Sequence, residues 1–368
     1  MTNTQQPWYL RLVKWSNLSL IVGAVFILSA LGVVKVGGSS ASAADGGKFA
    51  PPTGFALSVV GQDIDSIEAY VSSVGYMPGG VVGYTSLQNL EGITSVADNG
   101  AGRNYLDYLA STYPNSTIVL GLYLVNYLDT INSGGADANI DSLVDHLATY
   151  NRPVYLRFGY EFDGSWNAYD PTKYKNAWLR FYNRMVARGV TNIAMVWQSA
   201  TSCDGTYRRY PISSWYPGDS YVDWMGLSHF KPAKCNFSKL NELISFARSH
   251  NKPVLTSEST PQGYELGRLT YSDDGRRFKS KTSLQIWSEW YQPYYNFLYN
   301  NQDVMRGAAY INADWNSQPM WGFPYTNGYW GDSRAHINTT ILVNWKTELD
   351  KPYWLHGSPT LFATLGYL

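Results

Sequence analysis

The sequence is poor in the residues from which many catalytic and metal sites are built. Its 368 residues include two cysteines and five histidines, and charged residues make up 15% of the chain. It contains no G-x-S-x-G, H-E-x-x-H, P-loop or C-x-x-C motif. These absences argue against serine hydrolases of the α/β type, zinc peptidases and phosphate-loop enzymes. We therefore expect a protein that needs no metal and no other cofactor.

An excess of one charge is also lacking, since 28 Lys and Arg balance 28 Asp and Glu. Binding to nucleic acid through a basic surface is therefore not expected. Aromatic residues, in contrast, are abundant: 14 Trp, 30 Tyr and 13 Phe. So many rings predict a large core together with a surface that stacks on the apolar faces of sugars. We expect a monomer whose partner is a polysaccharide or oligosaccharide.

A long apolar run occurs near the N-terminus. Residues 17–34 carry no charge and follow Arg11 and Lys14, and an A-x-A pattern lies at residues 41–43. This arrangement is typical of a secretory signal peptide, here residues 1–43. The run also approaches the roughly 18 residues that indicate a membrane span, so an uncleaved anchor is the alternative. Both interpretations predict a secreted or extracellular protein, either free or attached to the membrane through residues 17–34.

The segment after the signal or anchor is rich in Gly, Ala and Pro. We interpret residues 44–53 as a linker and residues 54–368 as one folded domain. Because the protein is expected outside the cytoplasm, Cys203 and Cys235 are predicted to form a disulfide. Two free, buried thiols are the alternative.

Eight short apolar runs follow, separated by amphipathic stretches. The runs are almost continuously apolar, which is typical of parallel strands buried on both faces. They cover residues 55–60, 80–84, 117–125, 153–161, 192–199, 222–230, 252–259 and 305–314. The clearest helix is 170–189, where Asp170 can cap the N-terminus, Pro171 suits the first turn and Gly189 can end the helix.

The alternation of eight strands with helices predicts a single (β/α)₈ TIM barrel. A doubly wound sheet is the rival. It requires a glycine-rich turn after its first strand, and "VVGQDIDS" is not such a turn. The long connection over residues 260–304 is predicted to begin as a loop over the barrel mouth.

Two glutamates close predicted strands: Glu161 ends the fourth and Glu258 the seventh. Active sites of TIM barrels lie at the C-terminal ends of the strands, so both side chains are expected at the mouth. Two carboxylates on either side of a sugar linkage are what glycoside hydrolysis requires. The alternative is a pair of structural acids, with Arg157 as a nearby ion-pair partner.

Three segments carry a resemblance to a known family. "RFGYEFDGSW" (157–166) resembles the R-x-x-x-E-x-N-G-x-W stretch of glycoside hydrolase family 26, the β-mannanase family of the clan A barrels. "YPGDSYVDWMGLSHF" and "KPVLTSES" are similar to the sixth-strand and seventh-strand segments of that family. The similarity spans most of residues 55–350. It implies a retaining enzyme, endo-acting on a β-linked polysaccharide such as mannan, with Glu161 as acid/base and Glu258 as nucleophile.

The resemblance also implies a set of substrate-binding residues: Arg157 beside the acid, Trp166 as a stacking platform, Trp315 as the floor of the site, and Tyr160 and His229 at the scissile bond. In the family, His usually stands at the position of Tyr160 and Tyr at that of His229, so the sugar is left open.

Two residues of this region keep alternative interpretations. Trp197, at the end of the fifth strand, either forms another sugar platform or packs in the barrel. Asp163 either binds a hydroxyl group or shapes its loop. The function also has two alternatives: a non-catalytic carbohydrate-binding or surface-structural protein on the same barrel, and a transglycosylase that acts on cell-surface glycan.

Overall fold

The computed structural model of the protein describes residues 46–203, 210–232 and 234–367. The predicted signal peptide or anchor at residues 1–43 lies outside the described residues. Among the helices in the described ranges, none has the length and apolar character needed to cross a membrane.

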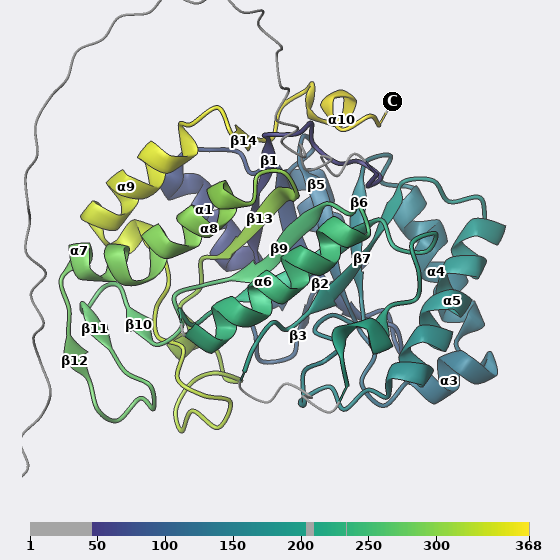
Figure 1. Cartoon of the computed structure of the whole chain (residues 1–368), viewed down its shortest axis with the longest axis horizontal. Helices are drawn as coiled ribbons and strands as arrows, with labels where there is room; N and C mark the ends of the chain where they lie inside the picture. Colours follow the sequence, from purple (N-terminus) through teal and green to yellow (C-terminus); the bar gives the residue numbers. More distant parts are fainter. Residues whose placement is uncertain (1–45, 204–209, 233, 368) are drawn as a thin grey trace, which may run out of the picture. The chain divides into compact units, whose positions relative to one another are not determined.

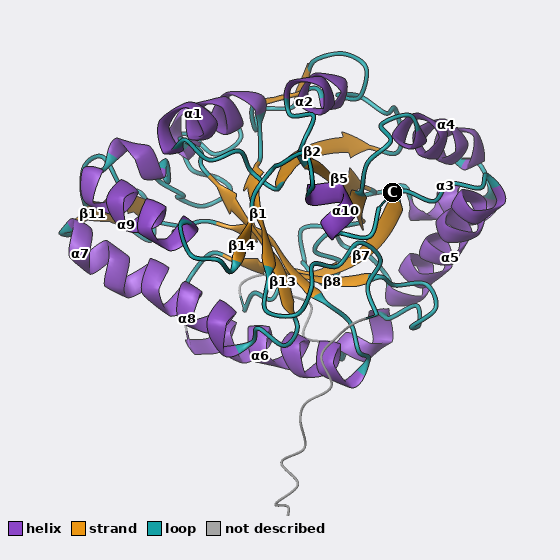
Figure 2. Ribbon diagram, turned by 90° about the horizontal axis from the view of Figure 1, so that it is seen from above, coloured by secondary structure: helices purple, strands orange, loops and turns teal. Residues whose placement is uncertain are grey.

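Eight parallel strands form a closed barrel. Their order around it is β1, β2, β5, β6, β7, β8, β9 and β13, and β13 pairs back to β1. Seen from above, the strands fill the centre and helices surround them (Figure 2). The barrel strands are β1 (Ala56–Gly61), β2 (Gly80–Ser86), β5 (Thr117–Tyr123), β6 (Val154–Phe158), β7 (Ile193–Ser199), β8 (Trp224–His229), β9 (Val254–Ser259) and β13 (Met305–Ile311). Each predicted apolar run overlaps one of them, and the TIM-barrel prediction is confirmed.

Helices of the connections cover the outside of the barrel (Figure 1). They are α1 (Ile64–Val74), α2 (Leu106–Thr112), α3 (Leu128–Ser133), α4 (Asp137–Ala148), α5 (Pro171–Ala187), α6 (Lys234–Ser249), α7 (Ser283–Ile286), α8 (Gln292–Asn300) and α9 (Thr339–Leu349). In α5, the side chain of Asp170 accepts hydrogen bonds from the backbone N–H groups of Thr172 and Lys173, as its capping role predicts. A π-helical turn, Trp287–Tyr291, joins α7 to α8.

Side chains along each strand alternate between two cores. One set points into the barrel and fills it, as Val119, Tyr155 and Trp224 do. The other set points outward and packs against the helices, as Leu120 and Leu156 do. Because alternation has a period of two, neighbouring residues at a strand end face different environments. This rule decides which of them reach the mouth.

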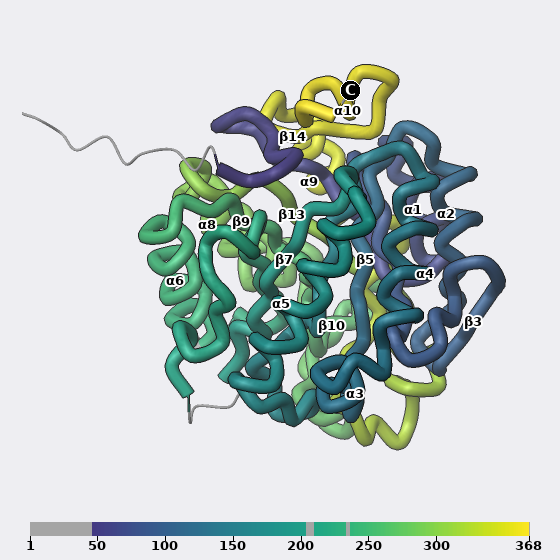
Figure 3. The backbone as a smooth tube through the Cα atoms, turned by 90° about the vertical axis from the view of Figure 1, so that its right-hand side faces the viewer, coloured from purple at the N-terminus to yellow at the C-terminus, as the bar shows by residue number. Residues whose placement is uncertain are grey.

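The N-terminal ends of the strands are closed by both ends of the described chain. Phe49 packs into the barrel core together with Leu361 and Leu365 of the α10 segment (Leu361–Thr364 and its C-cap). The backbone before β1 and the α10 segment lie at the same end of the barrel, beside β14 (Trp354–Leu355) (Figure 3). The described part of the predicted linker therefore packs against the barrel.

Longer connections gather at the opposite end, where the strands terminate. The predicted mouth loop of 260–304 contains a small antiparallel sheet before it enters α7. Its strands are β10 (Tyr264–Glu265), β11 (Thr270–Tyr271) and β12 (Lys279–Ser280). A hairpin of β3 (Ala97–Asp98) and β4 (Arg103–Asn104) follows β2.

Candidate active site

Glu161 lies three residues beyond β6, in a turn with an unusual backbone. Its φ is 55°, in the left-handed region that non-glycine residues rarely adopt. Asn167 holds the turn, since its Nδ2 donates to the backbone oxygens of Tyr160 and Glu161, both at 2.9 Å. Such a conformation costs energy, and residues that hold it cluster at functional sites. The turn fixes the direction of the Glu161 carboxyl group.

Both oxygens of Glu161 accept hydrogen bonds. Oε1 accepts from Ser228 Oγ at 2.7 Å, and Oε2 accepts from Trp166 Nε1 at 2.9 Å. The residue is 7% exposed. Burial, followed by the nearby charge of Glu258, raises the pKa of Glu161 to about 8, although the hydrogen bond from Ser228 lowers it. A carboxyl group with this pKa is largely protonated at neutral pH, as a general acid must be.

Glu258 reaches the same site because of an irregularity in β9. Along the β8–β9 ladder, Leu227 pairs with Thr256 but Ser228 pairs with Glu258, so Ser257 is an extra residue. Leu255 belongs to the core inside the barrel, and strict alternation would turn position 258 outward. A β-bulge re-aims the side chain that follows it. Here it brings Glu258 to the mouth.

Two side chains bind one carboxylate oxygen of Glu258. The guanidinium of Arg157 forms an ion pair with Oε1, and Tyr84 donates its hydroxyl to the same oxygen at 3.1 Å. Arg157 is fully buried, whereas the side chain of Glu258 is 12% exposed. Oε2 receives no hydrogen bond from any described residue. That oxygen is therefore available to a bound molecule.

A glycine on β5, Gly121, leaves room for this arrangement. Gly121 pairs with Tyr84 on one side and with Arg157 on the other. A Cβ atom at position 121 would lie 2.5 Å from the ring of Tyr84. The ring therefore fits over Gly121, and Arg157 Nη1 donates to its hydroxyl at 3.2 Å. Tyr160 completes the group, with its ring edge-on to that of Tyr84 and 5.1 Å from the guanidinium carbon.

The structure corrects three of the predicted substrate contacts. Arg157, expected beside the acid and in reach of substrate, lies beneath Glu258 and is inaccessible. Trp197 and His229 point out of the barrel, because they are neighbours in sequence of the inward residues Gln198 and Ser228.

Trp197 is fully buried and stacks on Phe162 at 4.4 Å between ring centroids, so it has the packing role of its two alternatives. His229 is 1% exposed and stacks on Tyr294 of α8 at 5.2 Å. Neither ring nitrogen of His229 has a hydrogen-bond partner among the described residues, and burial lowers its pKa to about 3. It therefore remains neutral, away from the mouth.

Trp166 is accessible, as its predicted role as a sugar platform requires. It is 50% exposed, and a Cβ atom at position 164 would lie 2.4 Å from its indole, so the ring lies against Gly164. Asp163, in the same loop, accepts hydrogen bonds from Ser199 Oγ and the backbone N–H of Ala200, both at 2.7 Å. Those contacts and its 9% exposure give Asp163 the loop-shaping role.

Trp315 is less accessible than its predicted role as the floor of the site requires. It is 2% exposed, because Trp330 stacks on it at 4.6 Å. Trp321 packs edge-on against both rings, and Phe230 completes the group. We name these four residues the β13 aromatic cluster. Sequence reasoning selected only the most buried member.

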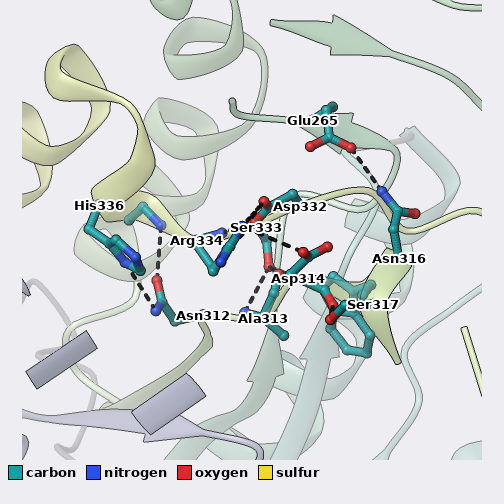
Figure 4. A network of polar contacts seen from close by, with 12 residues as sticks. Glu265, Asn312, Ala313, Asp314, Asn316, Ser317, Asp332, Ser333, Arg334 and His336 are labelled. Carbon is teal, nitrogen blue, oxygen red and sulfur yellow. Dashed lines mark hydrogen bonds and ion pairs between the residues drawn. The ribbon is translucent and has the colours of Figure 1, made fainter. Parts of the chain in front are cut away.

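A polar network holds the loop that carries this cluster (Figure 4). Asn316 donates to Glu265 of β10 at 2.9 Å. Arg334 forms ion pairs with Asp332 at 2.6 Å and Asp314 at 3.5 Å. The network thus ties the β13 loop to the small sheet over the mouth. Considering only residues that the structure describes, no group of three or more His, Cys, Asp or Glu is arranged to hold a metal ion.

Sequence reasoning missed Tyr84, Gln198 and Ser228. Each occupies an inward position near the end of its strand, and that position was the signal that could have identified them. The disulfide between Cys203 and Cys235 stays a prediction, because the side chain of Cys235 lies outside the described residues.

Comparison with known proteins identifies the family. The profile described as glycosyl hydrolase family 26 matches residues 121–314, more than half of the chain. The chain belongs to glycosyl hydrolase family 26. Family 26 membership makes it a glycoside hydrolase and confirms the resemblance inferred from the three segments. A β-1,3-xylanase of a Vibrio species is 44% identical over 325 residues, which cover 87% of this chain and 70% of the relative. A β-1,3-xylanase of an Alcaligenes species is 44% identical over 333 residues, 89% of this chain and 70% of the relative.

Solved structures of family 26 share the fold at low identity. An endo-β-1,4-mannanase of Cellulomonas fimi has a TM-score of 0.56 at 15% identity, covering 84% of this chain and 74% of that one. A β-mannanase of Bacteroides ovatus has a TM-score of 0.53 at 13% identity, covering 83% of this chain and 92% of that one. At such identities the likeness is one of fold.

Proposed function

We propose that this family 26 enzyme is a retaining, endo-acting β-1,3-xylanase in which Glu161 is the acid/base and Glu258 the nucleophile. The observation that carries the proposal is the unequal environment of the two carboxyl groups. Glu161 is buried with a raised pKa, whereas Glu258 is paired with a buried arginine and keeps one oxygen open. Glycosidases assign different roles to two carboxyl groups through such differences.

The first step breaks the glycosidic bond. Oε2 of Glu258 attacks the anomeric carbon, and Glu161 transfers its proton to the departing sugar oxygen. This yields a glycosyl ester on Glu258 and a carboxylate at Glu161. The Arg157 and Tyr84 donors on Oε1 balance the charge of Glu258 before attack. They also hold its side chain in place, so that little motion is needed.

The second step reverses these roles. Esterification removes the negative charge of Glu258, which is the second cause of the raised pKa of Glu161. The pKa of Glu161 therefore falls in the intermediate, and Glu161 becomes a base. It accepts a proton from water as the water oxygen attacks the anomeric carbon, and Glu258 is released as a carboxylate.

Aromatic residues on both sides of the carboxyl groups support endo action. Trp166 follows β6, and the three tryptophans of the β13 aromatic cluster follow β13, four strands further around the barrel. An aromatic plane buries the C–H face of a sugar ring. Accessible rings on both sides, Trp166 and the partly exposed Trp321, suit a chain bound along the mouth and cut within its length.

The choice of xylan rests on the sequence relatives. The proteins named β-1,3-xylanases are 44% identical over most of the chain, whereas the two mannanase structures are 13% and 15% identical. The substrate proposed here therefore replaces the mannan-type polysaccharide that the family resemblance implied. Tyr160 in place of the usual His of the family is consistent with a changed sugar at the scissile bond.

The test is hydrolysis of β-1,3-xylan, β-1,4-xylan and β-1,4-mannan by the wild type, Glu161→Gln and Glu258→Gln. We expect release of reducing ends from β-1,3-xylan alone, a loss of at least about 10²-fold in either variant, and β-configured first products in ¹H NMR. Glu242→Gln on the exposed surface of α6 is the matched control. α-Configured first products would refute the nucleophile role of Glu258, and products longer than the substrate would indicate transglycosylation.

Secretion is part of the proposal and has a separate test. We infer that residues 1–43 direct export, either as a cleaved signal or as an anchor at residues 17–34. N-terminal sequencing of the protein exported by its host distinguishes the two: cleavage after residue 43 gives a free enzyme. An intact N-terminus in the membrane fraction indicates the anchor, and full-length protein retained in the cytoplasm contradicts export.

A further inference from the structure

Two buried polar side chains connect the carboxyl groups of Glu161 and Glu258. Arg157, the partner of Glu258, donates from Nε to Gln198 Oε1 at 2.7 Å. Gln198 Nε2 donates to Ser228 Oγ at 3.0 Å, and Ser228 Oγ donates to Glu161 Oε1 at 2.7 Å. Gln198 has no exposure and Ser228 is 3% exposed.

The chemistry of arginine fixes the direction of every bond in this chain. A guanidinium group has donors and no acceptor. The oxygen of the Gln198 amide must therefore face Arg157, and its NH₂ group must face Ser228. Because that NH₂ group donates to Ser228 Oγ, the hydroxyl hydrogen of Ser228 points to Glu161. Arg157, the cation that binds Glu258, thus fixes the orientation of the Ser228 hydroxyl that donates to Glu161 Oε1, although two residues separate Arg157 from Glu161 in this chain of bonds.

We propose that Gln198 and Ser228 are positioning residues that connect the Arg157–Glu258 pair to the acid/base and decide which oxygen of Glu161 carries the transferred proton. The proposal rests on the role of Glu161 proposed above. In the acid form, the carbonyl oxygen is the better acceptor, and Ser228 reserves Oε1 for that purpose. Oε2 also accepts from Trp166 Nε1, but the hydroxyl of Ser228 makes the shorter contact, 2.7 Å against 2.9 Å, so the proton resides on Oε2.

The remaining groups around Glu161 do not supply this donor. Asp163, in the same loop, has one oxygen bound to Ser199 and the other to the backbone of Ala200. The charged and titratable groups that face Glu161 or its partner from β2, β6, the loop after β6 and β9 are Tyr84, Arg157, Tyr160, Asp163 and Glu258. None of these groups is itself changed by the substitution of Ser228.

The contact between Trp166 Nε1 and Glu161 Oε2 provides a direct probe. In protein labelled with ¹⁵N-tryptophan, the indole N–H signal of Trp166 should titrate with Glu161, and Trp166→Phe identifies it by its disappearance. We expect a midpoint near pH 8 in the wild type. In Ser228→Ala the midpoint should rise by about half to one pH unit, because one hydrogen bond to the carboxylate is lost.

Two further variants separate positioning from packing. Ser259→Ala is the matched control: Ser259 is also a buried serine at a strand end, but its hydroxyl binds the backbone oxygen of Ala309, away from Glu161. Its midpoint should equal that of the wild type. Gln198→Met keeps the length of the side chain and adds no charge, but it can neither accept from Arg157 nor donate to Ser228. The Ser228 hydroxyl is then no longer directed to Glu161 by position 198, and the midpoint should rise by up to as much as in Ser228→Ala.

Equal midpoints in the wild type, Ser228→Ala and Gln198→Met would overturn the proposal. An equal rise in Ser228→Ala and Ser259→Ala would also overturn it, because any loss of a buried hydroxyl would then have the same effect. The alkaline limb of kcat/KM on β-1,3-xylan should move with the midpoint. If that polysaccharide is not cut, the titration still reads Glu161, so failure of the proposed function and failure of the relay are distinguishable.

Discussion

The substitution Glu161→Gln is expected to stabilise the protein at alkaline pH and to do so less at acidic pH. Glu161 is a buried carboxyl group whose pKa is raised from an ordinary value of 4.5 to about 8. Between these two values the folded state binds more protons than the unfolded state. The free energy of unfolding therefore falls as pH rises through this window and becomes constant above it. Glutamine keeps the shape of the side chain and carries no charge.

The size of the effect follows from the two pKa values. Integration of the proton difference between pH 5 and pH 8 gives a loss of about 3.5 kcal/mol in the wild type that is absent in the variant. This is a large fraction of the roughly 5–15 kcal/mol that stabilises a typical domain. Burial of Glu161 and repulsion by Glu258 therefore act against folding at alkaline pH, and the same two effects keep the acid protonated near neutral pH.

Urea unfolding of the wild type and Glu161→Gln at pH 5 and pH 8 measures this difference, read from the midpoint at constant m-value. Other titrating groups are common to both proteins, so they cancel in the comparison. Glu242→Gln, on the surface, should change the free energy of unfolding by less than about 0.5 kcal/mol at either pH. A variant whose advantage is the same at pH 5 and pH 8 would refute the reasoning, because burial of Glu161 would then not favour its neutral form.

Four other substitutions test the arrangement of the site. Arg157→Met should lower the free energy of unfolding by about 3–5 kcal/mol in thermal or urea unfolding, since Glu258 loses its buried counter-ion; a neutral effect would contradict the pair. Trp166→Ala should raise KM for β-1,3-xylan by about 2- to 10-fold with an unchanged Tm, whereas Trp197→Ala should cost about 3–5 kcal/mol of stability and leave KM unchanged. His229→Phe should raise the unfolding free energy by about 1 kcal/mol, because two unpaired ring nitrogens leave an aromatic pocket; a drop in kcat/KM at constant stability would instead place His229 in the site.

The sequence by itself determined the barrel and the two strands that carry the carboxyl groups. Apolar runs of the length of a strand, separated by amphipathic helices, have few arrangements other than a parallel sheet with helices outside it. In a barrel the ends of the fourth and seventh strands share one mouth, so Glu161 and Glu258 are expected there although 96 residues separate them in the sequence. The same segment also predicted Trp166 as a sugar platform, and this residue is half-exposed in the structure.

Only the tertiary structure decided which neighbours of these residues belong to the site. Apolar runs buried on both faces show no alternation in sequence, so Trp197 and His229 resembled site residues as much as Gln198 and Ser228 did. The bulge at Ser257 reverses the side to which Glu258 points, and one extra residue leaves no pattern in a short strand. The contact of Tyr84 with Arg157 depends on Gly121 between them, a relation across three strands that exists only when the strands are aligned. Strand register and side-chain direction are set by packing of the whole barrel, and they decide the chemistry of its mouth.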